Sequence, residues 1–366
     1  MTTWLPYGII LCKALCIERG VRLRAPFTTI EDVAARAGVS ITTVSHVRSG
    51  NRPVNAATAE RVTRAMRELH YSPNRAARTL ALGKAQTLGL LVPDITNTFF
   101  AELAKGAEDK ADSLGYGMLL GNASFDAGRE LHYLNALRSR AVDGLIYAAG
   151  APPNRQYLAR LAEHFPVAVV DEALTDIPAV SVLSDNRKGG ALVADLLYRQ
   201  GHRSILMITG PRDLPSSVQR AEGFMAALGK RQARGAVTVS TVEGAYDQTS
   251  GFRIVSELVR AGIFVSTAVF ALNDLMAVGA MRALQDAAIA IPEDVTVVGY
   301  DDTVLASSVT PGLTTVHQPA YEMGARAAAE VLRSVASGVP PTPGQIVLDV
   351  ELVERGSSAA VRGYKA

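Results

Sequence analysis

Polar and aromatic side chains that could bind a small molecule follow many of the apolar segments after residue 87. They are Asp94 to Phe100, Asp171, Ser216 to Arg220, Tyr246, Asn273 with Asp274, and Asp301 with Asp302. Carboxylate and amide oxygens accept hydrogen bonds from hydroxyl groups, an Arg donates several, and aromatic rings cover apolar faces. This combination of residue types suits a sugar or a similar polyol.

Each of these residues also has a purely structural alternative. Asn273 and Ser216 are residue types that cap helices. Phe99 and Phe100 would fit a hydrophobic core, and Asp302 would fit a turn. Binding is favoured because several candidates occur, each after a separate apolar segment.

Catalysis is less well supported than binding. The six His residues are scattered, and neither a Gly-x-Ser-x-Gly motif nor a Walker loop occurs. Asp301 and Asp302 could form a catalytic pair, but adjacent residues on a strand point to opposite faces. We therefore expect no enzyme activity, no metal site and no cofactor.

The elements that would position these residues alternate between apolar strands and amphipathic helices from Thr87 onward. The predicted strands are Leu88–Val92, Met118–Leu120, Gly144–Tyr147, Val167–Val170, Val180–Leu183, Ile205–Ile208, Val237–Ser240, Ala268–Leu272 and Val295–Val298. Such alternation is typical of a doubly wound parallel α/β fold, whose ligands bind beyond the carboxyl ends of the strands. The length of this part, residues 87 to 366, favours two lobes.

Residues 28 to 72 have a different pattern, that of three short helices. Thr29, Ser40 and Asn55 are the predicted N-caps, and Gly38 separates the first two helices. Apolar residues at helical spacing would form one small core, namely Ile30, Val33, Ala34, Ala37, Val44, Val47, Val62, Met66 and Leu69. Two helices separated by a Gly turn are a candidate helix-turn-helix.

Residues 73 to 86 are predicted to form a hinge helix and a linker. Pro73 suits a first helical position and the Ala-rich run after it favours helix. The segment is short and largely polar, and an isolated helix of this size is marginal in water. We expect it to become ordered only when something holds it.

Charge is distributed unevenly along the chain. Residues 1 to 85 carry 13 Lys and Arg against 5 Asp and Glu, whereas the rest carries 24 against 30. A basic N-terminal part indicates a polyanionic partner, and a solvated basic surface is the alternative.

Residues 1 to 27 are an unassigned extension that holds both cysteines, Cys12 and Cys16. No disulfide is expected in the rest of the chain, which fits a reducing compartment. The pair lacks nearby residues to complete a metal site. The apolar stretch Ile9 to Ile17 is too short to span a bilayer, so we expect no membrane partner.

Six motifs occur in a fixed order. They are Thr29-Ile-Glu-Asp-Val-Ala-Ala-Arg-Ala-Gly-Val-Ser40 followed by Thr43-Val-Ser-His46, Tyr71-Ser-Pro-Asn74, Ala77-Arg-Thr-Leu80, Val298-Gly-Tyr-Asp-Asp302, Leu313-Thr-Thr-Val-His-Gln-Pro319 and Glu351-Leu-Val-Glu-Arg-Gly356. Together they resemble the LacI–GalR family of bacterial transcription regulators, over about residues 28 to 361.

The resemblance implies a DNA-binding headpiece that contacts a double-stranded operator. Its second helix would enter the major groove and present Ile41, Thr42, Ser45 and His46, and Ser40, which precedes that helix, is a further implied DNA contact. Contacts that grip phosphates and set the register are implied for Thr29, Asn55, Thr58, Tyr71 and Asn74. Thr58 also suits a helix start and Tyr71 the headpiece core, and both roles can coexist.

The resemblance further implies that paired hinge helices of a homodimer lie in the minor groove. There Leu80 would wedge into the central base step, with Ala77 beside it. Unstacking costs a few kcal/mol, which the contacts of the bent duplex offset. The alternative for Leu80 is ordinary interdomain packing, which its polar surroundings disfavour.

For the body, the resemblance implies two lobes like those of periplasmic sugar-binding proteins. The first lobe would span about residues 87–185 and 316–341, and the second about 186–315 and 342–366. The effector residues would be Phe100, Asp171, Arg220, Tyr246, Asn273 and Asp301, to which the strand-end criterion adds Ser216. Arg220 would be the strongest anchor through charge-assisted hydrogen bonds.

The sequence departs from the family pattern at three places. Arg48-Ser49 stands where an apolar residue and Asn are usual, Glu172 where a basic residue is common, and Leu214-Pro215 is unusual in the effector loop. These departures leave the identity of the effector open.

The expected function is that of a cytoplasmic, homodimeric repressor whose operator affinity is controlled by a sugar or sugar derivative. A solute receptor would need an export signal and no headpiece. A sugar-modifying enzyme would need a nucleophile, a metal or a phosphate loop.

Overall fold

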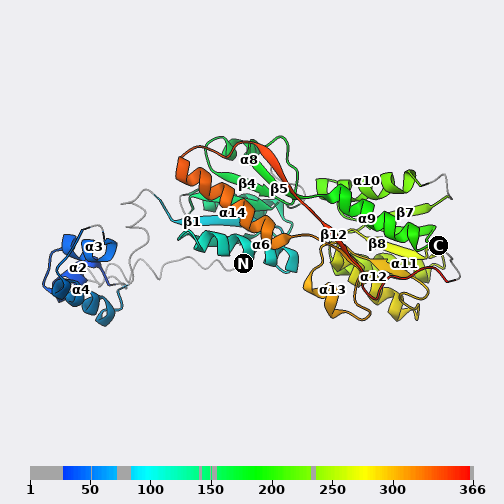
Figure 1. The fold of residues 1–366 in the computed structure, drawn as a ribbon, viewed down its shortest axis with the longest axis horizontal. Coiled ribbons are helices and arrows are strands. Elements are labelled where there is room, and N and C mark those ends of the chain that lie inside the picture. The colour runs from blue at the N-terminus through cyan, green and yellow to red at the C-terminus, as the bar shows by residue number, and fades with distance from the viewer. Residues whose placement is uncertain are drawn as a thin grey trace, which may run out of the picture. The chain divides into compact units, whose positions relative to one another are not determined.

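The computed structural model describes residues 28–50, 52–71, 84–139, 142–148, 150, 155–231 and 236–362. The chain divides into two compact units, one up to Lys84 and one from Ala85 onward (Figure 1). The extension 1–27 with Cys12 and Cys16, and the predicted hinge residues Asn74, Ala77 and Leu80, lie outside the described residues.

The first unit contains three helices, α2 (Ile30–Ala37), α3 (Ile41–Ser49) and α4 (Ala56–Glu68). Thr29 and Asp32 form a capping box at the start of α2, and Gly38 ends that helix with a left-handed φ of 66°. Ser40 and Asn55 accept hydrogen bonds from backbone N–H groups in the first turns of α3 and α4. The three predicted caps are therefore confirmed.

The three helices share a small hydrophobic core. Val33 from α2, Val44 from α3 and Val62 from α4 are fully buried at its centre. Burial of such a side chain stabilises the fold by about 1.5–3 kcal/mol. The core therefore fixes α3 against the two other helices.

The first lobe of the second unit is built on a parallel sheet with the strand order β11-β5-β4-β3-β1-β2. The strands are β1 (Thr87–Val92), β2 (Gly117–Asn122), β3 (Gly144–Ala148), β4 (Val167–Val170), β5 (Val180–Ser184) and β11 (Gly344–Leu348). Its two faces are covered by the helix pair α6 (Thr98–Asp112) and α14 (Ala320–Ser337), and by the pair α7 (Ala127–Arg138) and α8 (Arg155–Ala162). Because helices cover both faces, β1, β3, β4 and β5 are buried at every position.

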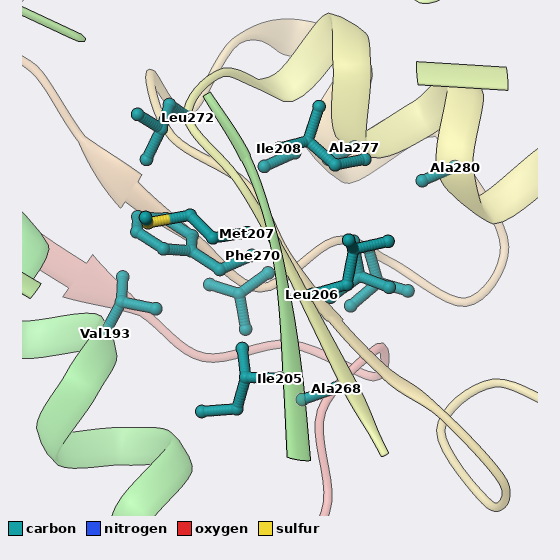
Figure 2. Packing of buried hydrophobic residues seen from close by; sticks show 14 of the residues in the cluster. Val193, Ile205, Leu206, Met207, Ile208, Ala268, Phe270, Leu272, Ala277 and Ala280 are labelled. Carbon is teal, nitrogen blue, oxygen red and sulfur yellow. The ribbon is translucent and has the colours of Figure 1, made fainter. Parts of the chain in front are cut away.

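The second lobe is built on a parallel sheet with the order β7-β6-β8-β9. The strands are β6 (Ser204–Thr209), β7 (Thr238–Glu243), β8 (Ala268–Ala271) and β9 (Thr296–Val298), and the helices are α9 (Asn186–Arg199), α10 (Pro215–Gly229), α11 (Gln248–Arg260) and α12 (Asp274–Asp286). Figure 2 shows the core of this lobe, where side chains alternate along β6. Met207 lies on the side of Val193 from α9, and Ile208 lies on the side of Ala277 from α12.

Helices α9 and α10 approach each other closely through two glycines. A Cβ on Gly190 would collide with the backbone oxygen of Arg220, and a Cβ on Gly223 would collide with that of Arg187. Only glycine permits this contact between the two backbones. The position of α10, and of the side chains that it carries, is therefore fixed by α9.

Three chain segments connect the lobes, after β5, after α13 (Val304–Ser308), and after β11. Between the lobes, β10 (Thr315–His317) and β12 (Glu351–Val353) form an antiparallel pair. The two-lobed, doubly wound architecture predicted from the sequence is confirmed.

One predicted boundary between the lobes is wrong. The sequence assigns residues 342–366 to the second lobe, but β11 pairs in parallel with β5 of the first sheet. The chain therefore returns to the second lobe only after Leu348. The segment is short, and the local pattern of a strand does not specify its partner.

Candidate functional site

Arg220 is the centre of a buried polar cluster in the second unit. It lies on α10 and is only 3% exposed. Its Nε donates a hydrogen bond to Asn186 Oδ1 at 2.8 Å and its Nη1 donates to the Leu272 carbonyl at 2.7 Å. The guanidinium also stacks on Tyr300, 4.0 Å from the ring centroid. These contacts orient the guanidinium. Its Nη2 atom lies 3.9 Å from Asp171 Oδ1, which is too far for a hydrogen bond. The Nη2 hydrogens are therefore left for a ligand.

Two carboxylates flank this guanidinium, one from each lobe. Asp301, which follows β9, lies 3.5 Å from Nη1 and accepts a hydrogen bond from Gln318 Nε2 at 2.7 Å. Asp171, which follows β4, has a buried Oδ1 that accepts no hydrogen bond from any described residue. Burial raises the pKa of both carboxyl groups, and the charge of Arg220 opposes that rise. A buried acceptor without a donor indicates a place for a ligand hydroxyl.

Three residues of the cluster adopt left-handed backbone conformations. The φ angles are 72° at Asp171, 60° at Tyr246 and 115° at Asp301. Residues other than glycine persist in such conformations only when their surroundings enforce them, which is common at functional sites.

Asn273, between β8 and α12, and Tyr246, between β7 and α11, form the next part of the cluster. Asn273 Oδ1 caps α12 by accepting from Met276 N at 2.9 Å, and its Nδ2 donates to the Tyr246 carbonyl at 3.0 Å. The buried Tyr246 hydroxyl forms no hydrogen bond within the described part of the chain. Burial raises the pKa of Tyr246 to about 12, so this hydroxyl remains a donor at neutral pH. Asn273 therefore has the capping role that the sequence left open, and it also faces the cluster.

The first lobe contributes an apolar wall. Asn97 caps α6 by accepting a hydrogen bond from Phe99 N at 3.1 Å. The rings of Phe99 and Phe100 meet edge to face with centroids 5.1 Å apart. Both side chains belong to the core of this lobe and also reach the cluster, so the two alternatives for them coexist.

All seven residues predicted for the effector site line one pocket between the lobes. Phe100 and Asp171 come from the first lobe, and Ser216, Arg220, Tyr246, Asn273 and Asp301 come from the second. The space that no protein atom fills is about 400 Å³, including the part open to solvent.

Six further residues complete the lining of the pocket, namely Pro93, Asn97, Phe99, Phe125, Glu172 and Leu214. Asn97 and Phe99 lie in the range Asp94 to Phe100 that the strand-end criterion indicated, and the other four were not predicted as site residues. Asn186 and Gln318 act behind it by holding Arg220 and Asp301. Asn186 follows a predicted strand, so the strand-end criterion could have found it, whereas nothing local in the sequence indicates the stacking of Tyr300.

Glu172 links the first lobe to the start of α10. It is 1% exposed, its Oε2 accepts from Ser216 N at 2.9 Å, and its Oε1 accepts from Ser216 Oγ at 2.6 Å. Burial raises the pKa of Glu172 to about 8, and the charge of Asp171 adds to the rise. Ser216, predicted to contact the effector, is thus bound to a carboxylate of the opposite lobe.

The residues predicted to bind DNA are distributed over the surface of the first unit. On α3, Ile41 is 47% exposed, Thr42 is exposed, and Ser45 and His46 are half-buried. Thr29, Ser40 and Asn55 cap the three helices, and Thr58 lies in the first turn of α4. Tyr71 packs against the headpiece core. The α3 side chains therefore have the exposure that contact with a partner requires.

Within the described residues, no three His, Cys, Asp or Glu side chains are grouped so that they could hold a metal ion. None of the described helices is long and apolar enough to cross a membrane.

Two family models match the chain. Residues 29–74 match the model described as "Bacterial regulatory proteins, lacI family". Residues 194–358 match the model described as "Periplasmic binding protein-like domain". The first match covers the three helices of the headpiece, and the second covers most of the second lobe.

Curated proteins and solved structures are similar over nearly the whole chain. The transcriptional regulator DegA of Bacillus subtilis is 36% identical over 339 residues, which are 91% of this chain and 98% of that protein. The ribose operon repressor of Escherichia coli is 36% identical over 334 residues, 90% of this chain and 99% of that protein. The Lac repressor dimer bound to operator and an anti-inducer has a TM-score of 0.79 at 30% identity, covering 91% of this chain and 100% of that one. A regulator from Enterococcus faecalis with bound ribose has a TM-score of 0.67 at 33% identity, covering 75% of this chain and 100% of that one.

Proposed function

The chain belongs to the LacI family of bacterial regulatory proteins, and we propose that it represses transcription under the control of a small molecule bound between its lobes. The observation that carries this proposal is the convergence of seven strand-end residues on one pocket in a chain that also contains a helix-turn-helix unit. The relatives with this architecture are regulators of transcription, not enzymes.

The DNA partner of the proposal is a pseudo-palindromic operator bound by a homodimer. Helix α3 would enter the major groove with Ile41, Thr42, Ser45 and His46, and Leu80 of each protomer would wedge into the central base step. The Lac repressor, which is similar over 91% of this chain, binds its operator as a dimer. Dimerisation matches the symmetry of the two half-sites.

The effector of the proposal is a sugar or a sugar derivative. Arg220, Asp171 and Asp301 offer donors and acceptors to hydroxyl groups, and Phe100 and Tyr246 offer aromatic faces. One structural neighbour holds ribose, and one curated relative is the repressor of a ribose operon. These observations support a ligand of this chemical class.

Effector and operator are coupled through the lobes in this proposal. Binding in the pocket would shift the lobes of the paired bodies and change the spacing of the hinge segments. By linkage, DNA and effector must change each other's affinity by the same factor. A regulator that acts on operators in this way would work in the cytoplasm.

Two measurements on the purified full-length protein test the proposal. Fragments of the source genome captured by the protein should share a pseudo-palindrome, and fluorescence anisotropy should show affinity that falls steeply with salt. A thermal-shift screen of sugars should identify ligands that raise Tm and also change operator affinity. Absence of any selected sequence, with and without those sugars, would reject the function.

A further inference from the structure

The start of α10 meets the end of β4 at a single contact. Leu214 occupies the N-cap of α10 and has no side chain that could accept a hydrogen bond, and Pro215 at the first helical position has no N–H group. The first free donor of the helix is therefore Ser216 N. This donor is bound by Glu172 from the opposite lobe.

The contact supplies α10 with the cap that its own sequence lacks. An N-cap side chain normally accepts from the second or third backbone N–H of its helix. The Glu172 carboxylate performs this role for Ser216 and binds its hydroxyl as well.

The same helix carries the main cation of the pocket. Ser216 and Arg220 are four residues apart and thus lie on one face of α10. The face is buried, since Ser216 is 2% exposed and Arg220 is 3% exposed. A displacement of Ser216 would therefore displace Arg220 relative to its partner Asp171 across the pocket.

The first-lobe end of the contact is held firmly. Glu172 directly follows Asp171, whose φ of 72° ends β4 in a conformation that its surroundings must enforce. Among the described residues, the groups that face Glu172 are the carboxyl group of Asp171, the guanidinium of Arg220, the Ser216 donors and the hydroxyl groups of Tyr246 and Tyr147. The contact therefore connects the end of a buried strand in one lobe with the start of a helix in the other.

We propose that Glu172 is a positioning residue that holds the two lobes together through its hydrogen bonds to Ser216, a contact we call the clasp. The clasp sets the distance between Arg220 and Asp171 at which an effector can bind to both residues. The clasp replaces the local helix cap, so that α10 has a capped N-terminus only when the lobes are closed. This inference rests on the proposed function, because the position of Arg220 matters only if the pocket binds an effector.

The test measures lobe closure in the absence of DNA and effector. Two spin labels report the distance between the lobes by pulsed electron–electron double resonance. They are attached at Ala101→Cys on α6 and Thr249→Cys on α11, in a protein whose own cysteines are removed by Cys12→Ser and Cys16→Ser. We expect Glu172→Ala to replace the short distance of the parent protein by a longer and broader distribution. We expect Glu172→Gln, which keeps an acceptor for Ser216 N, to retain much of the short distance. Glu163→Gln, an exposed carboxylate of the same lobe, is the matched control.

A second variant separates the clasp from the cap. Leu214→Asp gives α10 an N-cap side chain of its own. In combination with Glu172→Ala, it should restore the hydrogen-exchange protection of the first turn of α10 that Glu172→Ala alone removes. It should not restore the short distance between the lobes. Unchanged distances in Glu172→Ala, or recovery of the distance by Leu214→Asp, would overturn the inference. Neither readout depends on an operator or an effector, so failure here is distinct from failure of the proposed function.

Discussion

Asn186 Oδ1 accepts a hydrogen bond from Arg220 Nε at 2.8 Å, so that the first residue of α9 holds the main cation of the pocket from behind. Both side chains are buried. The Nη atoms, rather than Nε, are thereby directed toward the carboxylates and the ligand space. A guanidinium oriented before the ligand arrives loses less conformational entropy on binding.

The first prediction concerns this anchor. Arg220→Ala should abolish effector binding in calorimetry while leaving operator affinity in the absence of effector within about twofold, because headpiece residues are unaffected. Asn186→Ala should weaken effector binding by roughly tenfold to a hundredfold, since a hydrogen bond to a charged group contributes about 1.5–3 kcal/mol. Arg212→Ala, an exposed arginine after β6, is the control. Effector binding retained by Arg220→Ala would exclude Arg220 as an anchor.

The second prediction concerns pH. The pKa of Glu172 rises from 4.5 in an unfolded chain to about 8 in the folded protein. Between pH 4.5 and 8, Glu172 is therefore protonated in the folded state and ionised in the unfolded state. The free energy of unfolding should therefore fall as pH rises from about 5 to 8. Glu172→Gln removes this component and should make the fall shallower, as measured by urea unfolding at several pH values.

The pH comparison must be a difference between variant and parent protein. Burial also raises the pKa of Asp274, to about 7, and its contribution remains in both proteins. Parallel curves for Glu172→Gln and the parent would show that Glu172 does not titrate in this window.

The third prediction concerns the contact of α9 with α10. Gly223→Ala places a Cβ against the backbone oxygen of Arg187, and such overpacking costs about 1–3 kcal/mol. Gly229→Ala in the same helix meets no atom within 4 Å and should be neutral or stabilising by up to about 1 kcal/mol. Equal urea midpoints for the two variants would contradict the close approach of the helices.

The fourth prediction concerns the hinge. Leu80→Ala should weaken specific operator binding by at least roughly tenfold, because the wedge that stabilises the bent duplex is lost. Effector affinity of the protein free of DNA should remain unchanged. Leu114→Ala, at a leucine that is 54% exposed in the first lobe, is the control. Equal operator affinity in an anisotropy titration would reject the wedge.

Much of the pocket could be predicted from the sequence because parallel strands end at one edge of a sheet. Asp171, Tyr246 and Asp301 each follow a separate strand, and no knowledge of side-chain contacts was needed to group them. The helix caps were equally predictable, since a cap depends only on residues within one turn.

The remaining features depend on contacts between residues far apart in the chain. Glu172 and Ser216 are 44 residues apart, and no local pattern indicates that Glu172 supplies the helix cap that Leu214 lacks. The lobe to which residues 344–348 belong was predicted wrongly for the same reason, because strand pairing is decided by the assembled sheet and not by the strand itself.

The position of β11 has a consequence for synthesis on the ribosome. The first lobe begins at β1 but is completed by α14 and β11, which are translated after the whole sheet of the second lobe. Domains tend to fold as soon as their residues emerge. The edge of β5, however, remains unpaired until β11 has been translated. A nascent chain that stalls before residue 344 would therefore expose an open strand edge, the kind of surface that chaperones protect from aggregation.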